Sequence, residues 1–357
     1  MALYGLDLGT TGIKGSGFRD GVWSTVTVET LIANQKKTTI KKTSRLTARQ
    51  GDGAVDILEY NDDVSHIGRG LTSASGVYQP IAQSRFYDGS LLPFVLVAIA
   101  KLNPTYEEQI SLELSLPVSV MESHTDLLEG IGAWILGKFE YKVNGLDYSV
   151  IIENFDFDNQ PLHAFIGLTH NEACLWVHEK PSKSTFVIFD DGGGTFDFTT
   201  LSDYIIDEQL SGGGQFGFYE GAKLLKQRLK DAYKLILPLY QTNDFIQKAA
   251  EGREVTVFVN GRYVPESNET GLVSVNISKQ CLADLATSLN KTIQFVSETI
   301  TTEMAEGVSL YLVGGPANLP LVSDRFRLEY PNIIVDKNRH LAAQGAWIFG
   351  TMRQQLA

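Results

Sequence analysis

Short apolar stretches separated by glycine-rich turns mark the beginning of the chain. Residues 3–8, 13–18 and 22–32 are predicted to form three strands. The same pattern starts again at residues 184–190, which are followed by predicted strands at 195–201 and 204–210. Helical periodicity and further strands follow each set. The sequence therefore predicts two α/β domains of similar plan.

Several connecting segments carry local signals. Asn-Gly dipeptides at 144–145 and 260–261 predict tight hairpin turns. Residues 169–178 and 339–354 are predicted to be helical. Residues 36–50 contain six lysines and arginines without an apolar period. They predict an exposed loop, with a contact surface for another subunit as the alternative.

The two sets of strands share a loop of unusual composition. In GLDLGTTGIKGSGF an apolar strand reaches Asp7, and glycine, threonine and a second strand follow. In VIFDDGGGTFDFTT the same order follows Asp190. Either loop alone is compatible with an ordinary hairpin turn, because glycine and aspartate are common in turns. The matched pair instead favours phosphate binding.

The first loop offers the groups that a phosphate chain requires. Glycines let the backbone approach a ligand, and exposed N–H groups then form an anion-binding concavity. Threonine hydroxyls add donors, and Lys14 adds a positive charge. Asp7 is expected to hold a magnesium ion through waters. The predicted cofactor-binding residues of this loop are Asp7, Gly9, Thr10, Thr11, Gly12 and Lys14.

The second loop repeats this chemistry with three consecutive glycines. Because glycine is costly in conformational entropy, its repeated use indicates close backbone contact with further phosphate oxygens. Asp190 is expected to reach the same magnesium ion as Asp7, so that two carboxylates and a divalent ion orient a triphosphate. The predicted binding residues are Asp190, Gly192, Gly193, Gly194 and Thr195.

A third glycine-rich turn is a candidate for adenosine binding. An apolar strand at 308–313 runs into Gly314, Gly315 and Pro316. Such a turn could let an adenosine pack against the backbone. An ordinary strand-to-helix turn is the alternative.

A fourth segment precedes the predicted helix at 217–235. Gly213 and Gly214 lie before the helix, and Lys223 and Gln227 lie on it. Polar groups of this helix are expected to border the base and ribose of the nucleotide.

Composition limits the compartment and the partners. The formal net charge of −12 disfavours direct nucleic-acid binding and permits a basic protein partner. The two cysteines, Cys174 and Cys281, form no CxxC motif, which disfavours a zinc site and a disulfide framework. The longest apolar run, residues 91–100, is too short to span a bilayer, and the first residues lack a signal-peptide pattern. We therefore expect a cytoplasmic protein with no membrane partner.

The order of these motifs resembles the superfamily of actin, Hsp70 and the sugar kinases, from Leu3 to about Gly350. GLDLGTTGIK resembles the family's first phosphate loop, FDDGGGTFDF the second, and LYLVGGPANLPLV the adenosine motif. AAQGAWIFG resembles the closing helix of the plasmid-segregation actins of the ParM type. The chain departs from the family pattern at three places. Pro316 stands where a third glycine is usual, and Asp191 replaces a residue that is usually apolar. Ala173 and Cys174 follow Glu172 where a proline nearby is more familiar.

The resemblance implies the actin-like ATPase fold, an α/β fold in which two RNase H-like α/β domains flank a nucleotide cleft. Domain I is expected to comprise residues 1–170 and 337–357, and domain II residues 171–336. The implied cofactors are ATP and Mg²⁺, with GTP left open because nothing in the phosphate loops reads the base. Asp7 and Asp190 are the implied metal ligands and belong, with Glu172, to the implied catalytic set.

The resemblance assigns Glu172 its part in that set. In the family a segment between the two phosphate loops supplies the residue that orients the attacking water, and LTHNEACLWV occupies that place here. A carboxylate there could polarise the water. Asn171 is the second candidate, and a surface glutamate at the start of a helix is the structural alternative.

Within the superfamily the sequence favours a stand-alone ATPase, and the resemblance to the plasmid-segregation actins implies a filament-forming protein that acts in plasmid or DNA segregation. The chain has no Trp-Asp-x-Arg-like segment that would supply a sugar-binding acid, and it ends before a peptide-binding domain of the Hsp70 kind. The implied partners are further copies of the chain and a basic, DNA-bound adaptor of the ParR type. A non-polymerising ATPase that activates another enzyme and a small-molecule kinase are the alternatives.

Overall fold

The structure is a computed structural model that describes residues 1–36, 55–71, 76–121, 124–177, 185–203, 205–264 and 271–356. It divides into two compact units, each with its own sheet and helices. Unit 1 comprises Met1–Lys183, Asp197–Thr199 and Asn338–Ala357, and unit 2 comprises Ser184–Phe196 and Thr200–Lys337. Apart from Lys36, the predicted loop at 36–50 lies outside the described residues.

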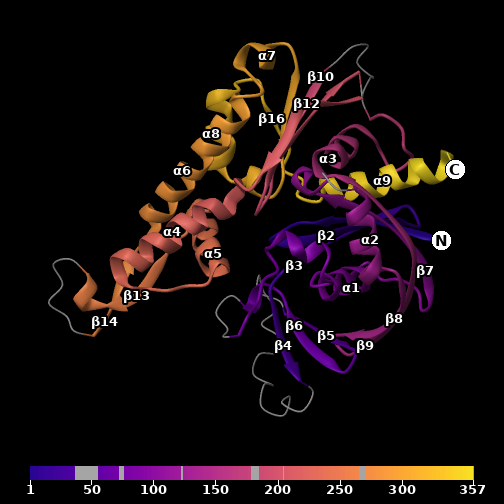
Figure 1. Ribbon diagram of the computed structural model, residues 1–357, viewed down its shortest axis with the longest axis horizontal. Helices are drawn as coiled ribbons and strands as arrows, with labels where there is room; N and C mark the ends of the chain where they lie inside the picture. The colour runs from indigo at the N-terminus through magenta and orange to yellow at the C-terminus, as the bar shows by residue number, and fades with distance from the viewer. Residues whose placement is uncertain are drawn as a thin grey trace. The chain divides into compact units, whose positions relative to one another are not determined.

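A mixed sheet of nine strands forms the centre of unit 1 (Figure 1). Its order is β3-β2-β1-β7-β9-β8-β5-β6-β4. The β1–β2 and β2–β3 pairs are antiparallel, whereas β1–β7 and β7–β9 are parallel. The strands are β1 (Ala2–Leu8), β2 (Gly12–Arg19), β3 (Val22–Glu29), β4 (Ile32–Lys36), β5 (Asp56–Tyr60), β6 (Asp63–Ile67), β7 (Glu108–Leu116), β8 (Gly137–Val143) and β9 (Leu146–Asn159).

Helices cover the two faces of this sheet. They are α1 (Leu92–Lys101), α2 (His124–Ile135), α3 (Gln160–Thr169) and α9 (Leu341–Leu356). Helix α1 packs on β2 and β3, and its residues 94–100 are all buried, as expected for a helix that is apolar on every side. Helices α3 and α9 lie side by side, and α9 packs on β1. Residues of α1, α2 and the sheet strands together form one hydrophobic core.

Glycines allow α9 to approach its neighbours closely. A Cβ atom on Gly345 would lie 1.7 Å from the carbonyl oxygen of His163 in α3. A Cβ atom on Gly5 in β1 would lie 2.2 Å from the carbonyl oxygen of Ala343. Any larger residue at these positions would push α9 away from the rest of unit 1.

The β8–β9 hairpin confirms the turn predicted at residues 144–145. Asn144 and Gly145 have φ values of 53° and 82°, which are the left-handed conformations that a type I′ turn requires. The ladder runs from Val143↔Leu146 to Gly137↔Ile152. Strand β9 then continues to Asn159, where helix α3 begins.

Unit 2 contains a five-stranded sheet and a separate two-stranded ladder. The larger sheet has the order β12-β11-β10-β15-β16, in which β10–β15 and β15–β16 are parallel. Its strands are β10 (Thr185–Asp191), β11 (Phe196–Ser202), β12 (Ile205–Gly214), β15 (Ser309–Val313) and β16 (Ile334–Val335). The ladder pairs β13 (Thr256–Asn260) with β14 (Leu272–Asn276).

Five helices accompany these strands in the described part of unit 2. They are α4 (Gly217–Tyr233), α5 (Leu239–Ala250), α6 (Ser278–Ser297), α7 (Thr302–Glu306) and α8 (Pro320–Glu329). Helices α4, α5 and α6 pack against one another, and α6 also packs on α8. No helix in the described ranges is long and apolar enough to cross a membrane.

Two local predictions are wrong. Residues 260–261 do not form a hairpin: the Asn260 side chain accepts a hydrogen bond from the Arg262 N–H and begins a 3₁₀ turn, so that β13 pairs with β14 instead. Residues 170–177 are not helical. The Asn171 side chain accepts hydrogen bonds from the N–H groups of Ala173 and Leu175, which closes a turn that a helix cannot contain.

Candidate functional site

The aspartate and lysine of the first loop face each other across the β1–β2 ladder. Asp7 and Lys14 are directly opposite residues of this antiparallel pair. The Lys14 Nζ lies 2.5 Å from the Asp7 Oδ2, and the Asp7 side chain is almost completely buried. The two residues are seven positions apart in the sequence, and the short turn between β1 and β2 places the Lys14 ammonium beside the Asp7 carboxylate.

The second oxygen of Asp7 is bound by a residue that no sequence motif indicates. The Gln160 side-chain amide donates a hydrogen bond of 2.5 Å to the Asp7 Oδ1. Gln160 opens helix α3, whose preceding residue Asn159 caps the Leu162 N–H with its side chain. The order Asn159, Gln160, Pro161 is a recognisable helix start, but this pattern does not show that the Gln160 side chain reaches β1.

An added side chain has no space at Gly9 and little space at Gly12 in the first loop. A Cβ atom on Gly9 would lie 2.7 Å from the Gly12 carbonyl oxygen. A Cβ atom on Gly12 would lie 3.2 Å from the carbonyl oxygen of Val28 in the neighbouring strand. The Thr11 carbonyl accepts a hydrogen bond from the Thr30 N–H, which ties the loop to the end of β3. The loop is thus held in a tight, fixed conformation.

A buried arginine supports the same loop from within unit 1. Arg85 donates hydrogen bonds from its guanidinium to the Thr10 Oγ1 at 2.9 Å and to the Leu8 carbonyl oxygen at 3.3 Å. Its guanidinium also lies 4.7 Å from the centre of the Phe86 ring. An arginine remains charged at any pH of interest, so this group places a fixed positive charge behind the loop. No local pattern indicates Arg85, because it lies 75 residues from Thr10 along the chain.

The second loop lies at the equivalent place in unit 2. Strand β10 ends at Asp191, with Asp190 opposite Val313 of the parallel strand β15. The Gly192 N–H donates to the Thr195 carbonyl oxygen at 2.9 Å, which closes the turn into β11. In each unit an aspartate therefore stands at the end of a central strand, and a glycine-rich turn follows.

The beginning of helix α4 packs directly on this loop. The N–H groups of Phe218 and Tyr219 donate to the carbonyl oxygens of Gly192 and Gly193, at 3.3 and 2.7 Å. A Cβ atom on Gly217 would lie 2.8 Å from the Thr195 carbonyl oxygen. Two of the N–H groups that a helix start leaves without a partner thus hold the loop in place.

Asp191, the residue that departs from the family pattern, has an unusual environment. It is completely buried, and burial raises the pKa of its carboxyl group well above the usual range. The neighbouring charge of Asp190 raises this pKa further. Among the described residues the Asp191 Oδ2 has no hydrogen-bond partner. We therefore expect the Asp191 carboxyl group to keep its proton to a higher pH than an ordinary aspartate does.

The predicted adenosine turn touches the second loop. Gly314 follows β15 with a φ of 97°, a conformation that favours glycine. A Cβ atom there would lie 2.3 Å from the Asp191 carbonyl oxygen and 2.5 Å from the Asp190 Oδ1. Gly315 faces open space, and Pro316 begins a 3₁₀ turn. The structure therefore brings Gly314 together with Asp190.

The remaining nucleoside candidates lie on β12 and α4. Gly213 and Gly214 end β12. Lys223 and Gln227 share one face of α4 and line a pocket of about 260 Å³ with Lys226. Their side chains bind residues of the same helix: Lys223 contacts Glu220 at 3.2 Å, and Gln227 donates to Asp231 at 2.9 Å. An ammonium has three N–H donors and an amide also has an acceptor oxygen, so these contacts do not prevent either side chain from binding a ribose.

Glu172 lies on an exposed turn of unit 1. The turn spans Asn171 to Leu175, and Cys174 within it has a φ of 60°. A bridge between His170 and Trp176 closes it. The Asn171 side chain is used in the hydrogen bonds of the turn itself, which leaves Glu172 as the residue of this segment with an exposed carboxylate.

No group of three or more histidine, cysteine, aspartate and glutamate side chains in the described ranges could hold a metal ion. Magnesium prefers oxygen ligands and usually retains several waters, so one or two carboxylates are enough when phosphates complete its shell. Asp7 and Asp190 are of the chemical type that this arrangement uses.

No protein-family model matches the sequence, and no curated protein matches it. Solved structures match it over nearly its whole length. The archaeal actin homolog Ta0583 has a TM-score of 0.69 at 17% identity, covering 99% of this chain and 100% of that chain. A 15-stranded ParM filament from Clostridium botulinum has a TM-score of 0.76 at 14% identity, covering 98% and 99%. Bacillus thuringiensis ParM with ATP has a TM-score of 0.59 at 16% identity, with both chains covered completely.

These likenesses show that the chain has the actin-like ATPase fold, as its motifs predict. The structures that it resembles include proteins solved with ATP and with ADP. An identity below one fifth supports the fold, whereas the roles of individual residues must be argued from the site.

Proposed function

We propose that this chain is a nucleotide-dependent, filament-forming ATPase. The observation that carries the proposal is the repeated arrangement in the two units, where Asp7 and Asp190 each end a central strand before a tight glycine-rich turn. Turns of this kind expose backbone N–H groups that suit phosphate oxygens. We infer that units 1 and 2 act as domains I and II and that both turns bind one triphosphate.

In this proposal each group has a distinct role in phosphoryl transfer. Asp7 and Asp190 would hold Mg²⁺ through waters, and a bound Mg²⁺ would supply positive charge beside the phosphates. Lys14, now paired with Asp7, adds a positive charge beside the phosphates, and the Arg85 guanidinium supports the loop from behind. Glu172 orients the water that attacks the γ-phosphate in line with the leaving ADP.

Two features support assembly into filaments with a segregation role. The chain is similar over nearly its full length to a ParM protein that was solved as a filament. Its net charge of −12 suits a basic adaptor and disfavours direct contact with DNA. We propose that filaments in the cytoplasm engage a DNA-bound basic adaptor and thereby move plasmid or other DNA.

The experiment is light scattering with ATP, GTP, ADP and no nucleotide at several protein concentrations, with phosphate release measured in parallel. Scattering that rises with a triphosphate above a critical concentration and decays as phosphate is released would support the proposal. Phosphate release without scattering at high protein concentration would contradict filament formation and favour an enzyme activator of the same fold. ADP formation that requires an added small molecule, which becomes phosphorylated, would identify a kinase.

A further inference from the structure

A groove on unit 2 runs between the exposed face of α4 and the segment that leads into α5. This α4 groove has a volume of about 260 Å³ and is lined by Lys223, Lys226, Gln227, Lys230, Ile236 and Leu239. Pockets that enclose a whole small molecule usually measure about 300–1,000 Å³. The size of the α4 groove therefore suits one or two side chains of a larger partner.

The walls of the α4 groove are held by interactions within unit 2. Arg228, on the same helix, donates to the two carboxylate oxygens of Asp284 in α6 at 2.9 and 2.6 Å, which fixes α4 against α6. Lys234 ends α4 with a φ of 55°, and the Leu235 N–H then donates to the Leu229 carbonyl oxygen at 3.2 Å. A partner therefore meets a preformed surface, which lowers the entropic cost of binding.

Two of the three ammonium groups in the α4 groove have no carboxylate beside them. Lys223 lies 3.2 Å from Glu220, which neutralises its charge in part. The side chains of Lys226 and Lys230 form no ion pair or hydrogen bond in the described part of the chain. Asp231, the other carboxylate of α4, accepts a hydrogen bond from a side-chain amide of the same helix at 2.9 Å. The groove is thus a basic site on a chain whose formal net charge is −12.

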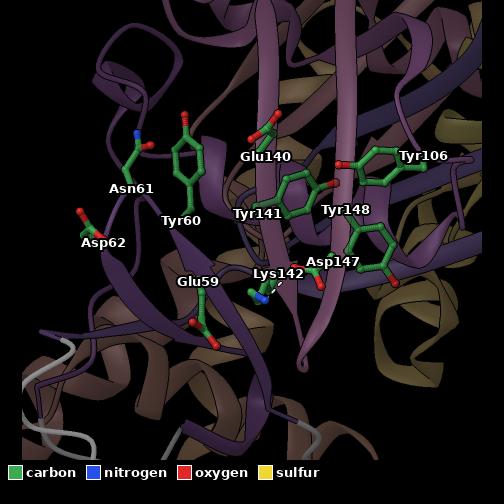
Figure 2. A pocket seen from close by; sticks show the side chains of 10 residues that line it. All are labelled: Glu59, Tyr60, Asn61, Asp62, Tyr106, Glu140, Tyr141, Lys142, Asp147 and Tyr148. Atoms are coloured by element: carbon green, nitrogen blue, oxygen red, sulfur yellow. Dashed lines mark ion pairs between the residues drawn. The ribbon is translucent and has the colours of Figure 1, made fainter.

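The pocket of unit 1 shown in Figure 2 differs in this respect. It measures about 300 Å³, and the ammonium group that lines it belongs to Lys142. That group lies 2.7 Å from a carboxylate oxygen of Asp147, and Lys142 is directly opposite Glu59 in the β5–β8 ladder. Carboxylates therefore match the positive charge within that pocket, whereas the α4 groove has none for Lys226 and Lys230.

The α4 groove also presents apolar surface to solvent. The Ile236 side chain is 74% exposed and lines the groove together with Leu239. The aliphatic stems of the lysines extend this apolar surface below their charged ends. A single exposed apolar residue is common in soluble proteins. Its place beside two free ammonium groups in one groove indicates a ligand that is both apolar and negatively charged.

We propose that the α4 groove binds an acidic segment of another protein through one or two leucine-like side chains. The apolar side chains of the segment lie on Ile236 and Leu239, and carboxylates on either side of them accept hydrogen bonds from the Lys226 and Lys230 ammonium groups. Nucleic acid or an anionic membrane would also meet the rest of an acidic surface, which repels an extended polyanion. These four groove residues are outside the proposed nucleotide site, so the two proposals can be tested separately.

The test follows the binding of a fluorescein-labelled peptide, Gly-Glu-Asp-Leu-Leu-Asp-Glu-Gly, to the full chain by fluorescence anisotropy. Two matched peptides separate the charged from the apolar contacts. Glutamine and asparagine replace the acids in one, and alanine replaces both leucines in the other. We expect the amide peptide to bind at least about ten-fold and the alanine peptide at least about five-fold more weakly, because each loses one set of contacts.

Single substitutions locate the site, each with a matched control in unit 2. Lys230→Gln should weaken binding about three-fold or more, whereas Lys279→Gln, an exposed change on α6 outside the groove, should leave it within about two-fold. Ile236→Ser should weaken binding about five-fold, whereas Leu272→Ser on β14, where the side chain is also 74% exposed, should leave it within about two-fold. Because all four side chains are exposed, the urea midpoints should stay close to that of the unmodified chain.

Charge reversal gives a test in which binding is gained. The double variant Lys226→Glu with Lys230→Glu should lose the acidic peptide and should bind the peptide Gly-Lys-Lys-Leu-Leu-Lys-Lys-Gly at least about ten-fold more tightly than the unmodified chain does. Lys230→Gln should leave the affinity for ATP within about three-fold, because Lys230 is not among the proposed nucleotide-binding residues. Failure of ATP binding in the unmodified chain would therefore count against the proposed function and not against the α4 groove.

Several results would overturn the proposal. Equal affinity for the acidic and amide peptides would exclude recognition of charge, and equal weakening by Lys230→Gln and Lys279→Gln would show diffuse attraction. A loss of ATP affinity in Lys230→Gln as large as its loss of peptide affinity would make the groove part of the nucleotide site. No binding of the acidic peptide at about millimolar protein would exclude such a segment. If the double variant then also failed to sediment with a triphosphate that sediments the unmodified chain, the occupant would be a second copy of the chain.

Discussion

The Lys14 ammonium lies 2.5 Å from the Asp7 carboxylate, directly opposite it in the β1–β2 ladder. We predict that Lys14→Met lowers the free energy of unfolding by about 2 kcal/mol, because it removes the cation from a buried carboxylate that then keeps its hydrogen bond from the Gln160 amide. Urea unfolding of the nucleotide-free chain measures this change. The control is Lys142→Met, which breaks an exposed ion pair with Asp147 and should cost less than about 1 kcal/mol. Equal losses in the two variants would contradict the importance of burial at Asp7.

Two adjacent glycines provide a matched test of the second loop. Gly314→Ala introduces a Cβ atom 2.3 Å from the Asp191 carbonyl oxygen at a φ of 97°, whereas Gly315→Ala introduces one that meets no atom within 4 Å. We expect Gly314→Ala to destabilise the chain by about 2–3 kcal/mol and to weaken ATP binding, and Gly315→Ala to change stability by less than about 1 kcal/mol. Thermal melting and titration with a fluorescent ATP analogue check both values.

Glu172 has an exposed carboxylate on a turn, so its replacement should not affect folding. We predict that Glu172→Gln lowers the rate of phosphate release about 10²-fold or more while nucleotide affinity stays within about three-fold, because orienting the attacking water acts on the chemical step. Single-turnover phosphate release and nucleotide titration separate the two effects. Glu153→Gln is the control for an exposed glutamate of the same unit. An unchanged rate in Glu172→Gln would remove this residue from the catalytic set.

We expect His340 to make the free energy of unfolding depend on pH. Burial, with smaller effects of Arg339 and Lys14, lowers the pKa of His340 to about 4, while its ring lies 3.0 Å from the Thr27 hydroxyl. In the unfolded chain the pKa of His340 is about 6.5, so as the pH falls below 6.5 the unfolded chain takes up a proton that the folded chain does not. The contribution of neutral His340 to the free energy of unfolding is therefore complete above pH 6.5 and is lost as the pH falls toward 4. Between pH 7.5 and 5 we expect a loss of about 1–2 kcal/mol that is absent from His340→Gln. Urea unfolding of both proteins at the two pH values compares them, and parallel curves would contradict the assignment.

The crossing of α3 and α9 can be tested with two helical glycines. Gly345→Ala would place a Cβ atom 1.7 Å from the His163 carbonyl oxygen, whereas Gly132→Ala in α2 would make ordinary contact at 3.5 Å with the Phe155 ring. We predict a loss of about 3 kcal/mol or more for the first change and a gain of up to about 1 kcal/mol for the second, since alanine favours helices. Thermal melting gives both values. Equal stability of the two variants would show that α9 can shift away from α3 without cost.

Local chemistry explains which features could be predicted from the sequence. The phosphate-loop candidates were found because glycine, aspartate and lysine at short spacing determine a turn and its cross-strand pair, as Asp7 and Lys14 do. The hairpin at Asn144 was predicted for the same reason, since the preference of Asn-Gly for left-handed conformations acts within two residues.

The failures arise where distant or competing interactions decide. Gln160 and Arg85 reach the first loop from 153 and 75 residues away, and no local pattern encodes these contacts. At Asn260 and Asn171 the side chain binds a nearby backbone N–H, which selects a turn different from the one that the pattern favours. The functional roles of the site residues remain predictions, because fold similarity does not assign them.

The packing of α9 on β1 also sets an order for folding during synthesis. The ribosome makes β1 before unit 2 and α9 after it. Until α9 emerges, the face of β1 at Gly5 and the side of α3 at His163 have no cover. Contacts so distant along the chain form slowly and leave apolar surface exposed to other nascent chains. Unit 2 can therefore complete its sheet while unit 1 still awaits its last helix, and a pause in translation after unit 2 would prolong the period in which unit 1 is prone to aggregate.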